Sequence, residues 1–220
     1  MNSPMVSRTT TQQGVMQTNK VLRNTYFLLS MTLLWSAVVA GFSMAMNLPR
    51  PGLIIMLVGF YGLLFLVEKN RNNSMGLVFT FLFTGFLGYT IGPILNMYIG
   101  AGMGDVVMTA LGGTALAFLG SSAYALTTKR DLSFLNGIMM AGFVVILVAM
   151  VANIFLQMPA LYLAMSGMFI LFSTGAILLT TQQIVRGGET NYISATITLY
   201  VSIYNLFISL LSILGVMNDD

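Results

Sequence analysis

The distribution of charge constrains this chain more than any other feature of its sequence. Nine basic and six acidic residues are spread over 220 positions, and all of them lie outside or at the ends of seven long apolar stretches. Charged residues make up 7% of the chain and hydrophobic residues 57%, whereas roughly 25% of an ordinary soluble domain is charged. Because so few charges cannot cover a soluble fold, the apolar surplus has to face lipid. The sequence therefore predicts an all-α membrane protein with seven transmembrane helices.

Each apolar stretch is long enough to cross a bilayer as a helix, which takes about 20 residues. The predicted spans are residues 26–46, 52–67, 75–98, 105–126, 132–156, 160–184 and 191–216. Gly92-Pro93 falls inside the third span, where we expect a kink or a break. Residues 1–22 are polar and bury too little to offset the entropy lost on ordering, which predicts a flexible cytoplasmic tail. Residues 23–220 then form one seven-helix transmembrane domain.

The basic residues fall almost entirely on one side of this predicted topology. Eight of the nine lie in the tail or in the loops after the second, fourth and sixth spans. These eight are Arg8, Lys20, Arg23, Lys69, Arg71, Lys129, Arg130 and Arg186. The other side holds Arg50 together with Asp105, Asp219 and Asp220. Cytoplasmic loops carry an excess of Lys and Arg, so the N-terminus is predicted inside and the C-terminus outside. Because topology accounts for the basic residues, no nucleic-acid partner is expected.

The composition also excludes most catalytic sites. The chain has no cysteine and no histidine, which rules out a Ser-His triad, a Cys-His dyad and histidine-ligated zinc. Gly102-Met103-Gly104-Asp105 resembles one half of an intramembrane aspartyl protease site, but that chemistry needs a second carboxylate close by. We interpret Asp105 as a carboxylate at a helix N-terminus. We therefore expect no enzyme activity, no catalytic residues, no cofactor and no metal site.

Small residues at four-residue spacing indicate close helix packing. Gly88 and Gly92 form one such pair, and a second series runs along the fourth span. That series is Gly113, Ala117, Ser121 and Ala125. Small side chains let helix backbones approach closely in lipid. We favour packing within one chain, and a homo-oligomer stays open as the alternative.

Polar residues inside the last three spans form a second group of candidates. They are Asn153, Thr180, Thr181, Gln182, Gln183, Ser202, Tyr204 and Asn205. Among them, we single out Asn153, Gln183, Tyr204 and Asn205 as the candidate polar interior. Amides in lipid are expected to hydrogen-bond neighbouring helices. A conduction path is the alternative, although proton-coupled carriers usually have embedded ionisable groups, and these spans have none.

The most specific local pattern joins the sixth and seventh spans. It consists of Gly187, Gly188, Glu189, Thr190, Asn191 and Tyr192. Two glycines suit the end of one helix, and a carboxylate with a threonine suits the start of the next. Arg186 is placed to pair with Glu189. Together with residues 20–30 and 84–89, this segment resembles the Bax inhibitor-1 family of membrane proteins, and the resemblance covers the chain after about Asn19.

The resemblance implies a bundle whose seventh helix is enclosed by the other six. For some members it also implies a pH-sensitive calcium leak governed by two aspartates, which match Thr180 and Ser202 here. Neither residue can ionise, which puts that mechanism in doubt. Within the family, the chain looks very close to a bacterial inner-membrane member that modulates the FtsH protease.

That likeness implies a non-enzymatic, multi-pass regulator of the bacterial inner membrane. Its partners would be the lipid bilayer and a membrane-anchored AAA metalloprotease complex of the FtsH type, which it would bind and restrain in the quality control of membrane proteins. A cation leak channel for calcium or protons is the alternative function.

Overall fold

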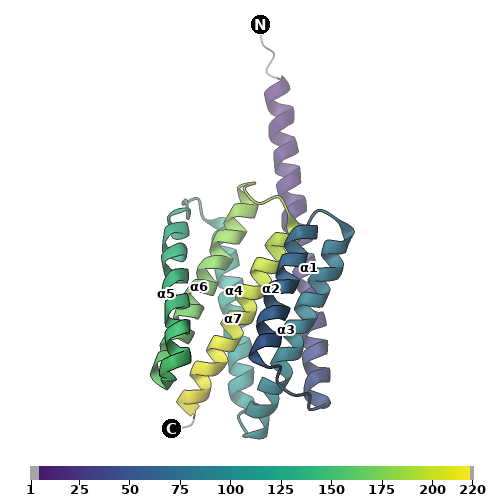
Figure 1. Cartoon of the computed structure of the whole chain (residues 1–220). Helices are drawn as coiled ribbons and strands as arrows, with labels where there is room; N and C mark the ends of the chain where they lie inside the picture. The colour runs from purple at the N-terminus through teal and green to yellow at the C-terminus, as the bar shows by residue number, and fades with distance from the viewer. Residues whose placement is uncertain (1–4, 219–220) are drawn as a thin grey trace.

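The seven apolar stretches form seven helices in the computed structural model, which describes residues 5–218, with side chains from Thr18 onward (Figure 1). The helices are α1 (Met5–Ala45), α2 (Leu53–Asn70), α3 (Ser74–Gly100), α4 (Gly104–Thr127), α5 (Phe134–Leu156), α6 (Pro159–Val185) and α7 (Tyr192–Asn218). All seven are long and apolar enough to cross a membrane, and residues 5–218 include no strand. The predicted all-α class and the number of spans are thus confirmed.

Helix α1 is much longer than the first predicted span. It begins at Met5 and runs through most of the segment predicted to be a flexible tail, so the backbone of residues 5–22 is helical. Residues 1–4 of the predicted tail lie outside the described part of the chain. Once a helix exists, extending it avoids the cost of nucleation, and polar residues alone do not stop it. At about 1.5 Å per residue α1 is about 60 Å long, and it extends well beyond the bundle (Figure 1).

The loops divide between two ends of the bundle. The end from which α1 extends also carries the α2–α3, α4–α5 and α6–α7 loops (Figure 1), and we call it the basic end. It holds seven basic residues whose side chains are described, namely Lys20, Arg23, Lys69, Arg71, Lys129, Arg130 and Arg186. The C-terminal end carries the other three loops, Arg50 and Asp105. Basic residues that alternate between loops along the sequence are therefore gathered at one end of the bundle in the structure.

Helix α7 is central but is not enclosed by all six other helices. It packs against α1, α2, α3, α4 and α6, whereas α5 packs only on α6 at the edge of the bundle (Figure 1). The expectation of a sixfold enclosure is thus wrong for α5. The physical reason lies in composition, because α5 has the highest mean hydropathy of the seven spans and little of it is buried. A helix that is apolar all round is satisfied by lipid on most of its surface.

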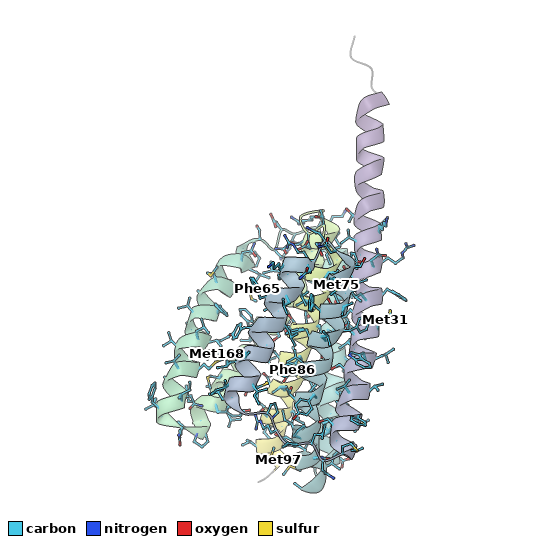
Figure 2. The ribbon with its side chains drawn as sticks, turned by 45° about the vertical axis from the view of Figure 1, so that its right-hand side comes forward. Met31, Phe65, Met75, Phe86, Met97 and Met168 are labelled. Atoms are coloured by element: carbon cyan, nitrogen blue, oxygen red, sulfur yellow. The ribbon has the colours of Figure 1, made fainter. Side chains whose placement is uncertain are left out.

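Close packing of α1 on α3 depends on glycines. A Cβ added at Gly88 would overlap the backbone and hydroxyl of Ser36, and one added at Gly92 would overlap Ser43. The small-residue pair of α3 therefore serves packing within one chain. The ring of Phe86 similarly fills the space over Gly59 between α3 and α2, and Met31 of α1 points away from the bundle (Figure 2).

Helix α3 continues without a break through Pro93, contrary to the break that the sequence allowed. Proline has no N–H, so the carbonyl of Tyr89 one turn earlier loses its helical donor. The hydroxyl of Ser43 on α1 donates to that carbonyl at 3.0 Å. A side chain from a neighbouring helix thus satisfies the freed group, which is how membrane helices tolerate proline. Because Ser43 lies this close to α3, a side chain at position 92, next to Pro93, would overlap it, and the residue there is glycine.

Candidate functional site

The α6–α7 junction at the basic end is built around a glycine in the left-handed region. Gly187 has φ +74°, a conformation that glycine adopts without strain. Its N–H donates to the carbonyl of Ile184 at 3.1 Å, and the N–H of Gly188 donates to the carbonyl of Gln183 at 2.8 Å. This pair of bonds is the Schellman motif that satisfies the last carbonyls of a helix. The two glycines therefore end α6 as their sequence predicts.

Asn191 begins α7 and also fastens the junction to the α2–α3 loop. Its Oδ1 accepts from the N–H groups of Ile193 at 3.0 Å and Ser194 at 3.2 Å, as an N-cap side chain does. Its Nδ2 donates to the carbonyl of Arg71 at 3.1 Å. Glu189 accepts from the N–H of Asn191 at 2.7 Å. Asn191 is thus the N-cap of α7, and the Glu189 carboxylate binds the backbone of Asn191 rather than capping the helix itself.

Arg186 pairs with Asp131 of the α4–α5 loop at 3.0 Å, so the expected pair with Glu189 is wrong. The guanidinium also donates to the carbonyl of Arg130 at 2.7 Å. Donation from the backbone N–H of Ser133 holds the pKa of Asp131 below its ordinary value, and the charge of Arg186 lowers it further. A hydrogen bond from a backbone N–H and a nearby positive charge both favour the charged form of the carboxylate. The junction thereby grips the α4–α5 loop as well.

Between the junction and α1 lies a cavity of about 1140 Å³. Its lining comes from the stretch of α1 between Thr18 and Asn24, from Leu126, and from the junction residues Arg186, Gly187, Glu189, Thr190 and Tyr192. A Cβ on Gly187 would lie 3.7 Å from the hydroxyl of Thr18. The junction therefore lies against α1 at the point where that helix leaves the bundle.

The two positions that match the aspartates of the resemblance lie on neighbouring helices and are buried. Thr180 is on α6 and Ser202 is on α7. The Ser202 hydroxyl donates to the carbonyl of Thr198 in its own helix at 2.7 Å. Neither side chain ionises in the physiological range, so this pair provides no carboxylate that could respond to pH.

The four residues singled out as a polar interior have different surroundings. Asn153 lies near the end of α5 and accepts from the N–H of Met158 at 3.1 Å. Tyr204 is partly buried and its hydroxyl bonds that of Thr90 at 2.9 Å. Asn205 is partly buried beside a cavity. Gln183 is exposed, so its assignment to the interior is wrong.

A hydrogen-bonded group between α1, α3 and α7 was not expected from the sequence. The Tyr200 hydroxyl donates to the carbonyl of Thr84 at 3.1 Å, and the Ser36 hydroxyl lies 2.5 Å from it. A phenol has one proton, so Ser36 is the donor in the second bond. The spacing of Tyr200 and Tyr204 one turn apart was the available signal, but nothing in the sequence marks Ser36 as their neighbour.

Comparison with known proteins places this architecture in a family. The family model described as inhibitor of apoptosis-promoting Bax1 matches residues 18–219. The chain belongs to this Bax1-I family. The family match begins within α1, at Thr18. Helix α1 before Thr18 thus lies outside the part that the Bax1-I model describes.

The chain also resembles individual Bax1-I proteins over most of its length. It is 60% identical over 216 residues to the modulator of FtsH protease YccA of Escherichia coli K12, covering 98% of this chain and 99% of the relative. Identity and coverage are the same for the inner membrane protein YccA of Escherichia coli O6:H1. An uncharacterized membrane protein of Vibrio cholerae is 48% identical, with full coverage of both chains. The family match from residue 18 agrees with the expectation that family likeness starts near Asn19, whereas the alignments to these individual relatives extend further toward the N-terminus.

Proposed function

We propose that this Bax1-I protein is a non-enzymatic regulator of the bacterial inner membrane that binds and restrains an FtsH-type AAA metalloprotease. The observation that carries the proposal is the N-terminal part of α1, which extends beyond the bundle at the basic end (Figure 1). The close relative named as a modulator of FtsH protease supports the partner. An extended, accessible segment is what a protease with an unfolding motor needs in order to engage a membrane protein.

The segregation of charge supports an orientation in which that segment is cytoplasmic. Among the described side chains, the basic end holds seven Lys and Arg and the opposite end holds Arg50. An excess of basic residues favours the cytoplasmic side. The N-terminus would then be inside and the C-terminus outside.

Restraint follows from the difference between the extension and the bundle. The protease grips the extension, but pulling further means exposing about 20 apolar residues of each span to water. Full exposure of one Leu-sized side chain costs about 1.5–3 kcal/mol. The basic end is also fastened by Asn191 to the α2–α3 loop and by Arg186 to the α4–α5 loop. The protease would stay occupied while other substrates wait.

The leak alternative finds less support in the structure. Thr180 and Ser202 are neutral, and the Ser202 hydroxyl is engaged with its own helix. The spans of the chain carry no acidic or basic residue away from their ends. A carboxylate that opens or closes a path with pH therefore has no counterpart at these positions.

Co-purification from native membranes tests the proposed partner. A chain tagged at its C-terminus and solubilised in mild detergent is expected to recover the FtsH-type protease, identified by mass spectrometry. A matched chain that lacks residues 2–17 keeps the whole seven-span bundle, and we expect it to recover much less of the protease. Absence of the protease from the full-length preparation would contradict the proposal.

A further inference from the structure

A second polar region lies in the outer half of the bundle, far from the basic end. It is a cavity of about 340 Å³ between α5, α6 and α7. Six polar side chains line it, namely Asn153, Tyr162, Ser166, Asn205, Ser209 and Ser212. Three helices thus contribute polar groups to one space inside a protein whose spans are otherwise mostly apolar.

The α7 side of the cavity is a continuous polar stripe. Asn205, Ser209 and Ser212 follow one another at helical spacing, so they share one face of α7. Asn205 is the midpoint of α7, which spans Tyr192–Asn218. At the other extreme, Asn153 and Tyr162 lie within about one turn, ~3.6 residues, of the ends of α5 and α6. The cavity therefore reaches from the C-terminal end of the bundle to the middle of the membrane.

Among residues 18–218, two of the six polar side chains in the cavity have no hydrogen-bond partner, whereas the other four each make a bond. The Ser212 hydroxyl donates to the carbonyl of Ile208 and accepts from Tyr162 at 2.9 Å. By contrast, within residues 18–218 no group forms a hydrogen bond with the side-chain amide of Asn205 or with the hydroxyl of Ser209. An amide or hydroxyl left unpaired in hydrocarbon is costly. The occupant of this cavity must therefore donate and accept hydrogen bonds.

The geometry points to a water-filled vestibule that enters from the C-terminal end and closes at mid-membrane. Its volume is far above the ~10–15 Å³ that one water needs, and polar side chains from three helices line it. A volume of about 340 Å³ is also too small for even one turn of a helix about 10 Å across. One turn further in, Ser202 is buried, is not part of the lining and bonds its own helix. The vestibule therefore ends near Asn205.

Cysteine labelling tests the vestibule directly, because the chain has no native cysteine. The variants Ser209→Cys and Ser212→Cys place a thiol in the vestibule. Val151→Cys places one on exposed α5 at similar depth outside the lining, and Met217→Cys places one at the exposed C-terminal end. Ser202→Cys lies beyond the proposed closure. A small, cationic, membrane-impermeant methanethiosulfonate is added to sealed native membranes from the C-terminal side.

The expected order of reaction follows from the chemistry of the thiol. The thiolate reacts, and it forms in water rather than in lipid, so Ser209→Cys and Ser212→Cys should react at least about tenfold faster than Val151→Cys. Met217→Cys should react fastest, and Ser202→Cys should stay unmodified. Rates at positions 209 and 212 as slow as at 151 would mean that lipid fills the cavity and would overturn the inference. Labelling of Ser202→Cys from the C-terminal side would show that the vestibule does not end near Asn205.

Discussion

At the scale of single residues, one buried glutamine holds the α4–α5 loop together with Arg186. Gln182 accepts from the N–H of Leu132 at 2.8 Å and donates to the carbonyl of Arg130 at 2.8 Å. Both backbone groups belong to a loop about 50 positions earlier in the chain. The sequence shows two adjacent glutamines at the end of α6, and they differ by about 100° around the helix. Choosing the inner one requires knowing where the loop lies, which is why Gln183 was the wrong choice.

Replacing these two glutamines in turn tests the difference between them. Gln182→Leu leaves the buried Leu132 N–H without an acceptor, so we expect the free energy of unfolding to fall by about 1–3 kcal/mol. Gln183→Leu changes an exposed side chain and should alter it by less than about 0.5 kcal/mol. Reversible unfolding of the purified protein in mixed micelles measures both. Equal effects of the two substitutions would show that the Gln182 bonds contribute little.

At the scale of helices, apolar length was enough to find the spans but not their neighbours. Six of the seven helices begin and end within three residues of the predicted bounds, because a span needs an uninterrupted apolar stretch. The extension of α1 was missed, since its residues show neither an apolar face nor a stop signal. The edge position of α5 was missed because a helix that is apolar all round has no face that predicts a partner.

The contact between α1 and α3 makes a prediction at this scale. Gly88→Ala places a methyl group against Ser36, and overpacking of this kind destabilises by about 1–3 kcal/mol. Gly112→Ala is the matched control, because it lies in the interior of α4 with nothing within 4 Å of the new Cβ. Alanine there should leave stability unchanged or raise it by up to about 1 kcal/mol. Thermal unfolding of the two variants and the unsubstituted protein in one detergent compares their stabilities. A Gly88→Ala variant as stable as the unsubstituted protein would contradict the tight α1–α3 contact.

At the scale of the whole molecule, the protein combines a bundle fastened at one end with a helix that projects from that end. Charge alternation in the sequence predicted which loops share an end, and the loop contacts of Asn191 and Arg186 agree with it. The junction that fastens the loops also lies against the exit of α1 through Gly187 and Thr18. The sequence marked the junction as specific, but only the fold shows that it adjoins the extension.

The most direct test of this account measures proteolysis. A purified FtsH-type protease and a membrane-protein substrate are reconstituted in liposomes, and the rate of ATP-dependent degradation is followed with and without this protein. The full chain should slow degradation of the substrate, whereas the chain without residues 2–17 should not. Unfolding of the two chains in detergent serves as the control that the bundle is equally stable in both. Equal inhibition by the two chains, or none by the full chain, would contradict restraint through the N-terminal extension.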